Sequence, residues 1–145
     1  MSLVTEEIKA KAEVYYGAEI CGEKGKLLLE EMGLPNGILP LDNIEECGYA
    51  KDTGFFWFKR KERKEFYWQN AGKLVCYDPE VTGYVEKSKI KKMKGIKSKE
   101  LSIWISISEV SVKNPPTAKV TFKGTAGLFM TYPLSYFVIQ EEKNM

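Results

Sequence analysis

The chain has 145 residues, of which 43% are hydrophobic and 29% are charged, and its net charge is +2. This balance is typical of a folded domain and argues against extensive disorder. Histidine is absent, which excludes Ser-His-Asp and Cys-His catalysis and the usual histidine-based metal sites. We therefore expect one domain over residues 1–145, with no metal ion and no cofactor, and the composition favours a non-enzyme.

The N-terminus has no basic segment followed by an apolar run, and no stretch approaches about 18 consecutive apolar residues. These features predict a cytoplasmic protein without a signal peptide or a transmembrane segment. The three cysteines, Cys21, Cys47 and Cys76, are odd in number and widely spaced. This spacing favours small buried residues in a reducing compartment over disulfides or a zinc site.

Residues 1–33 have the pattern of two helices. An apolar side chain recurs every three or four positions in the first half, which predicts an amphipathic helix with the stripe Val4, Ile8, Ala12 and Tyr15. Ser2 is placed to cap it. A second helix is predicted over residues 24–32, because Gly33 can end it in a left-handed conformation and Pro35 prevents its extension.

Residues 41–139 change to the period of two that is typical of strands. The clearest alternation covers residues 101–108, and further alternation lies at residues 73–77, 81–86, 117–123 and 134–139. The apolar run at residues 55–58 predicts a strand covered on both faces, and Gly83 predicts a bulge or a close backbone approach. The predicted fold class is therefore α+β and β-rich. Two N-terminal helices precede an antiparallel β-roll or partly closed barrel of about seven or eight strands, over residues 41–139.

Five short motifs follow one another along the chain: LPNGILP at 34–40, GFFW at 54–57, VTG at 81–83, GIK at 95–97 and YPLSYF at 132–137. Their order and spacing resemble the plant family of uncharacterised proteins catalogued as domain of unknown function 538, over roughly residues 24–139. The resemblance implies a plant origin and an antiparallel β-roll with N-terminal helical structure. The family has been likened to the lipid-binding domain of bactericidal/permeability-increasing protein, and both lipid binding and ester hydrolysis have been suggested for its members.

Charge is divided unevenly along the chain. Residues 1–50 contain four lysines against ten acidic residues, whereas residues 51–100 contain fourteen Lys and Arg against seven acidic residues. Seven lysines lie within residues 87–99, and such a segment attracts anionic lipid headgroups or nucleic-acid phosphates, or simply remains solvated. The predominance of lysine over arginine disfavours sequence-specific nucleic-acid recognition. The candidates for an anionic-surface contact are Lys87, Lys89, Lys91, Lys92 and Lys94.

Aromatic side chains are dense on both sides of the charged residues 59–65. A polar hairpin tip between two core strands explains this pattern, and an apolar pocket for an acyl chain or another amphiphile is the functional alternative. The candidates for a ligand pocket are Phe55, Trp57, Phe66, Trp68, Trp104 and Phe137.

Ser88 and Lys91 match the S-x-x-K pattern of serine nucleophiles, but that pattern needs a helix, and this segment is predicted to be strand or turn. No catalytic residue is assigned. The leading hypothesis is a binding module for lipid or a small amphiphile that docks at anionic membrane surfaces. The alternatives are a non-catalytic protein-interaction adaptor, whose protein partner is unknown, and a histidine-free ester hydrolase.

Overall fold

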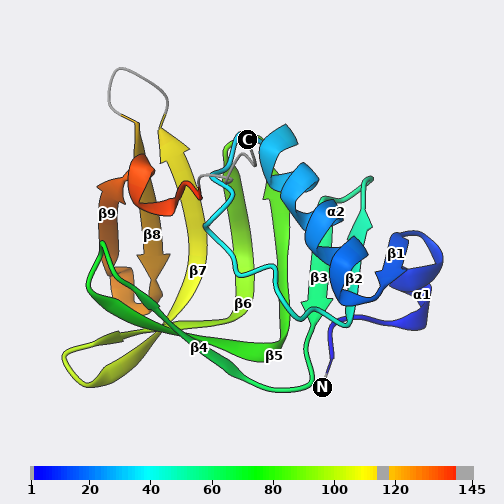
Figure 1. Ribbon diagram of the computed structural model, residues 1–145, viewed down its shortest axis with the longest axis horizontal. Helices are drawn as coiled ribbons and strands as arrows, with labels where there is room; N and C mark the ends of the chain where they lie inside the picture. Colours follow the sequence, from blue (N-terminus) through cyan, green and yellow to red (C-terminus); the bar gives the residue numbers. More distant parts are fainter. Residues whose placement is uncertain (1, 114–117, 140–145) are drawn as a thin grey trace, which may run out of the picture.

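The computed structural model describes residues 2–113 and 118–139 (Figure 1). Its described residues form two α-helices and one antiparallel sheet of nine strands. The helices are α1 (Glu6–Ala10) and α2 (Ala18–Glu31). The strands are β1 (Glu13–Tyr16), β2 (Glu46–Ala50), β3 (Phe55–Lys59), β4 (Lys64–Trp68), β5 (Lys73–Glu86), β6 (Lys89–Glu100), β7 (Ile103–Lys113), β8 (Lys119–Gly124) and β9 (Phe129–Pro133). Two short 3-10 turns, η1 (Thr125–Gly127) and η2 (Leu134–Phe137), flank β9.

The sheet order is β1-β2-β3-β5-β6-β7-β8-β9, and β4 pairs with the first half of β5. The predicted β-rich, antiparallel class is confirmed. The predicted barrel closure is only partly matched, because in the part of the chain that the structure describes the two end strands, β1 and β9, do not pair with each other. The sheet is strongly curved instead, so its concave side forms an open roll (Figure 1).

The N-terminal region corrects the prediction of two helices over residues 1–33. The first helix is only α1, and Thr5 rather than Ser2 caps it, with Thr5 Oγ1 accepting a hydrogen bond from Ile8 N at 3.2 Å. Residues 13–16 form β1 and pair with β2, because Val14 and the two tyrosines favour an extended backbone and Gly17 follows with φ = 111°. The second helix is confirmed, although it begins at Ala18 and is longer than predicted.

The sheet curves most where β5 and β6 bend together. Residues 78–81 of β5 lie opposite the single residue Gly95 of β6, between the pairs Tyr77–Ile96 and Thr82–Lys94. Gly95 has φ = 96°, and a Cβ atom there would lie 2.4 Å from the Glu80 carbonyl oxygen. Only glycine fits this position without strain. The two segments predicted at 73–77 and 81–86 are thus one bent strand.

Both faces of β3 are covered, as the apolar run at residues 55–58 predicted. Phe56 and Phe58 belong to the main core on the concave side, together with residues of α2. Phe55 and Trp57 belong to a smaller cluster with Val4 and Ala50, against which residues of the N-terminal segment pack. The predicted close approach at Gly83 is also confirmed, because a Cβ atom there would lie 2.9 Å from the Phe56 ring.

The segment between α2 and β2, residues 32–45, crosses the concave side of the roll (Figure 1). Helix α2 ends as predicted at Gly33, which has φ = 73°, and Leu34 N donates to the Leu29 carbonyl at 2.9 Å. Further along, Asn36 Nδ2 donates to the Ile139 carbonyl at 2.9 Å, and Ile139 N donates back to Asn36 Oδ1 at 2.6 Å. This segment, which we call the connector, therefore joins the helical part of the chain to its C-terminal turn.

Candidate functional site

A partly open cavity of about 340 Å³ lies between α2, the connector and strands β1–β3. Its volume is within the range of small-molecule sites, about 300–1,000 Å³. Most of its lining is apolar and comes from these elements: Leu27, Leu28 and Met32 on α2, Leu39, Leu41 and Ile44 on the connector, and Phe56 and Phe58 on β3. Charged side chains of both signs belong to the same lining, namely Glu13, Lys24, Glu31 and Lys51. The cavity can therefore take an apolar chain with a polar end.

Two of the three cysteines line this cavity. Cys21 is fully buried on α2, and its Sγ donates to the Tyr15 carbonyl at 3.4 Å, while Cys47 is half-buried on β2. Burial, with the neighbouring Cys21, raises the pKa of the Cys47 thiol to about 12. Cys47 is therefore a neutral thiol at physiological pH, the form that is a poor nucleophile.

Arg60 holds the connector beside the cavity. Its side chain is almost completely buried, Nε donates to the Asp42 carbonyl at 2.9 Å, and Nη2 donates to the Pro40 carbonyl. A planar guanidinium can reach two carbonyls in this way, whereas an ammonium group acts as a point charge. Because Leu39 and Leu41 flank these carbonyls and line the cavity, Arg60 positions part of its wall.

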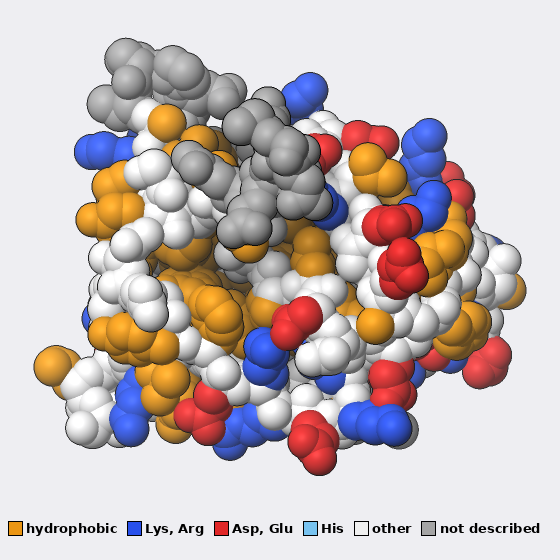
Figure 2. Space-filling model, viewed as in Figure 1, with side chains coloured by type: hydrophobic (Ala, Val, Ile, Leu, Met, Phe, Trp, Pro, Cys, Tyr) orange, Lys and Arg blue, Asp and Glu red, His pale blue; other side chains and the backbone are white. Residues whose placement is uncertain are grey.

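The structure divides the six aromatic pocket candidates among several places. Trp68 and Phe137 pack together inside the roll with ring centroids 5.0 Å apart, and Phe122 contacts both. Phe66 lies beside Trp68 on a second hollow of about 420 Å³ at the open side of the roll, and it is 47% exposed. Figure 2 shows apolar side chains inside the hollow of this face.

The other three candidates lie elsewhere. The rings of Phe55 and Trp57 are in the small cluster on the convex face, although Trp57 also contributes to the lining of the cavity. Trp104 is half-buried near the start of β7, and two cations lie near its ring, Arg63 at 5.6 Å and Lys99 at 5.8 Å. The predicted aromatics therefore do not form one pocket.

The basic candidates lie on the turn between β5 and β6 and on the first half of β6. Lys91 pairs with Glu86 at 2.8 Å and Lys89 with Glu109 at 3.8 Å. Lys92 Nζ lies 5.7 Å from the centre of the Tyr84 ring. Lys87 and Lys94 are exposed and form no ion pair among the described residues. Acidic neighbours thus neutralise part of this surface.

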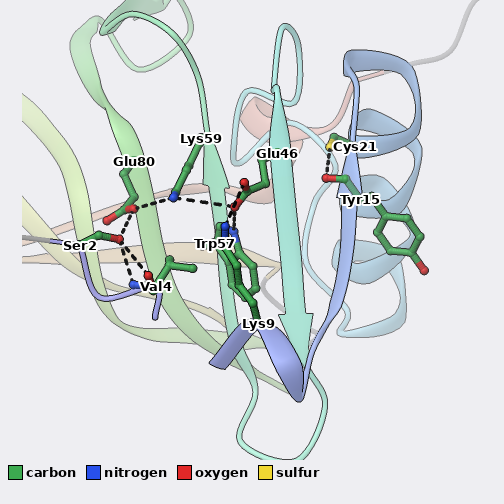
Figure 3. Close-up of polar contacts among 9 residues, drawn as sticks. All are labelled: Ser2, Val4, Lys9, Tyr15, Cys21, Glu46, Trp57, Lys59 and Glu80. Carbon is green, nitrogen blue, oxygen red and sulfur yellow. Dashed lines mark hydrogen bonds and ion pairs between the residues drawn. The ribbon is translucent and has the colours of Figure 1, made fainter. Parts of the chain in front are cut away.

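The convex face carries a polar network around Glu46 (Figure 3). The Glu46 carboxylate accepts a hydrogen bond from Trp57 Nε1 at 2.8 Å and another from Lys9 Nζ at 3.3 Å. Lys59 lies between Glu46 and Glu80, at 3.8 Å and 3.6 Å. Burial by itself raises the pKa of Glu46, but the Trp57 hydrogen bond and the two lysines outweigh burial, so the pKa lies below its usual value of 4.5.

Among the predicted pocket residues only Trp57 lines this cavity, and the sequence did not indicate the rest of its wall. Most of its apolar wall comes from α2 and the connector, which the sequence presented as an ordinary core helix and a stiff turn. One signal was available, because the apolar residues 27–29 of α2 are consecutive and therefore too wide for one buried face. Leu27 is accordingly 51% exposed and belongs to the cavity lining.

The described residues provide neither a metal-binding cluster nor a membrane-spanning helix. They contain no group of three or more Cys, Asp or Glu side chains arranged to hold a metal ion. None of their helices has the length and apolar character needed to cross a membrane.

Comparison with known proteins gives a family. No curated protein and no solved structure matches the chain. The family model described as "Protein of unknown function, DUF538" matches residues 25–138. This match includes the second half of α2, the connector and all strands from β2 to β9, and thus most of the cavity wall. Because it covers most of the 145 residues, the chain belongs to the DUF538 family.

Proposed function

We propose that this protein is a binding module for a lipid or a small amphiphile, which it holds in the cavity between α2, the connector and β1–β3. The observation that carries the proposal is the cavity itself, with about 340 Å³ of space and a mostly apolar wall. Burial of apolar ligand surface there contributes about 25 cal/mol per Å². The polar end of the ligand would lie at the mouth, near Lys24 or Lys51.

Binding is favoured over ester hydrolysis by the chemistry of the lining. No serine or threonine of the described residues lines the cavity. Its two thiols belong to Cys21 and Cys47, and the raised pKa of Cys47 keeps that thiol protonated. The cavity has the features of a site that holds an apolar chain, and none of its observed contacts favours attack on an ester.

The proposal includes docking at anionic membrane surfaces through the exposed lysines of the β5–β6 turn and the first half of β6. Lys87 and Lys94 support it, since each lysine near an anionic surface is worth about 1 kcal/mol. The other lysines contribute less, because each already interacts within the chain. Lys89 pairs with Glu109, Lys91 pairs with Glu86, and Lys92 lies near the Tyr84 ring.

Calorimetric titration with dodecanoate, in solution and below its micellar concentration, tests the cavity. We expect the wild type to bind one equivalent and Leu28→Trp to bind at least about tenfold more weakly, since the larger ring fills the cavity. Ile20→Trp is the matched control, because Ile20 lies on the same helix, is 38% exposed and does not line the cavity. If the wild type did not bind dodecanoate, or if Leu28→Trp bound it as tightly as the wild type, the cavity proposal would be wrong. A protein-interaction adaptor would then be the favoured function.

A further inference from the structure

The β6–β7 hairpin ends in an exposed apolar tip, which we define as residues 100–103. Glu100 pairs with Ile103, so Leu101 and Ser102 form a two-residue turn. Leu101 is 97% exposed and Ile103 is 62% exposed. The hairpin projects beyond the body of the sheet at the lower left of Figure 1. Burial within this chain therefore does not explain why the tip is apolar.

The backbone of the tip is strained for these residues. Leu101 has φ = 49° and Ser102 has φ = 72°, the two positive angles of a type I′ turn. Asn-Gly is the dipeptide that fits such a turn, because both positions need the left-handed region. Leu101 is therefore unfavourable for two reasons: its backbone is strained in this turn, and its apolar side chain is exposed to water. Backbone strain of this kind is typical of functional positions.

With increasing distance from the tip, the side chains change from apolar to aromatic and then to basic, as the layers of a membrane change from acyl chains to headgroups. Trp104 comes next on β7 and pairs with Lys99 on β6, and Lys97 lies two residues further from the tip. Tryptophan concentrates at the headgroup level of membranes, and lysines bind the phosphates of anionic lipids. Figure 2 shows apolar side chains at this corner of the molecule with Lys or Arg side chains beside them.

The negative charge of Glu100 at the tip is neutralised within the chain, so it adds little repulsion from an anionic surface. The Glu100 carboxylate forms an ion pair with Lys73 and accepts a hydrogen bond from Ser98 Oγ at 3.1 Å. Arg63, near the Trp104 ring, adds a further cation, although it also pairs with Glu65 at 3.6 Å. The η1 turn and Leu128 lie beside the first part of β7. A Cβ atom at Gly124 of β8 would lie 2.8 Å from the Ile105 side chain and 3.7 Å from the Leu128 side chain.

We propose that the β6–β7 hairpin inserts its tip into the surface of an anionic lipid bilayer, with Leu101 and Ile103 among the acyl chains, Trp104 at the headgroups and Lys97 and Lys99 on the phosphates. This extends the proposed function by naming a membrane contact that is separate from the lysines of the β5–β6 turn. It does not depend on the cavity, since the tip, residues 100–103, contributes no residue to that lining.

The experiment measures flotation of the full chain with vesicles of 30% phosphatidylserine in phosphatidylcholine, and with pure phosphatidylcholine. The decisive variant is Leu101→Asn/Ser102→Gly, which gives the turn its preferred residues. We expect a higher Tm than the wild type together with at least about tenfold weaker binding to the anionic vesicles, since burial of one leucine contributes roughly this factor. These opposite effects separate loss of the membrane contact from loss of folding.

Two further variants locate the contact. Leu3→Ser is the matched control, because Leu3 is an exposed leucine in the N-terminal segment, and its binding is expected to equal that of the wild type. With brominated phosphatidylcholine in the anionic vesicles, we expect quenching of tryptophan emission that Trp104→Phe removes. The proposal would be overturned if the wild type did not bind the anionic vesicles, or if Leu101→Asn/Ser102→Gly bound them as well as the wild type does. It would also be overturned if only Lys87→Gln/Lys94→Gln abolished binding. Dodecanoate binding by the Leu101→Asn/Ser102→Gly variant is expected to be unchanged, which separates this test from that of the cavity.

Discussion

The indole of Trp57 donates its Nε1 hydrogen to the carboxylate of Glu46 at 2.8 Å, across the neighbouring strands β3 and β2. Lys9 of α1 reaches the same carboxylate at 3.3 Å (Figure 3). The contact therefore fastens the N-terminal helix to the outside of the sheet on which the cavity is built. The Glu46 side chain is only 14% exposed, so water replaces little of this network when one member is removed.

Replacing Glu46 should separate the loss of the hydrogen bond from the loss of the charge. Glu46→Ala leaves the Trp57 N–H and the Lys9 ammonium without their acceptor, and we expect it to lower the free energy of unfolding by about 1–3 kcal/mol. Glu46→Gln keeps an acceptor and should lose less. Urea unfolding followed by tryptophan emission measures both, and equal stability of Glu46→Ala and the wild type would show that the network contributes nothing.

The lowered pKa of Glu46 predicts a pH dependence of stability. Since its carboxyl titrates below the usual 4.5 in the folded chain, the unfolded state binds more protons as the pH falls. The stabilisation is complete above the unfolded pKa and is lost as the pH falls through the folded pKa. We expect the stability difference between the wild type and Glu46→Gln to be constant near pH 7 and to shrink below about pH 4. A difference that grew on acidification would contradict this assignment.

Gly48 is the position on β2 where a side chain is least tolerated. A Cβ atom there would lie 2.2 Å from the Trp57 ring, whereas one at Gly127, whose φ is 74°, has no atom within 4 Å. We expect Gly48→Ala to lose more than about 3 kcal/mol of stability or to fail to fold, and Gly127→Ala to lose only about 1 kcal/mol through backbone strain. Thermal unfolding of the two variants makes the comparison, and similar Tm values would refute the packing argument.

Arg60 offers a test of how the cavity wall is positioned. In Arg60→Lys one ammonium group replaces the fork that holds the carbonyls of Pro40 and Asp42. We expect a loss of about 1–3 kcal/mol in stability and weaker dodecanoate binding, although residue 60 does not line the cavity. Arg63→Lys is the control, since Arg63 is half-exposed and should change neither quantity. If Arg60→Lys bound dodecanoate as tightly as the wild type, the hydrogen bonds from Arg60 to the connector would not be needed to position the cavity wall.

The five sequence motifs explain why much of the fold was predictable. GFFW lies beside VTG, because Phe56 pairs with Gly83, and GIK lies beside VTG, because Gly95 approaches Val81. LPNGILP meets the C-terminal motif where Gly37 N donates to the Phe137 carbonyl at 2.7 Å. The motifs are therefore positions of close backbone approach that depend on one another, which is why their order along the chain indicates a particular fold.

The wrong strand predictions arise where the alternation of the sequence does not mark the end of a strand. The strand predicted over residues 101–108 begins only at Ile103, because its period of two continues through a turn that lacks the usual Asn-Gly. The strand predicted over 134–139 is wrong, as η2 occupies residues 134–137 and β9 ends at Pro133. Local alternation cannot decide such cases, and neither can it assemble a cavity from α2, the connector and three strands.

Calorimetric titration of the wild type, Leu28→Trp and Ile20→Trp with dodecanoate decides whether the cavity holds an amphiphile. An amphiphile site there predicts one equivalent bound by the wild type and by Ile20→Trp, and binding at least about tenfold weaker by Leu28→Trp. No heat of binding with the wild type, or the same affinity in all three proteins, would contradict it.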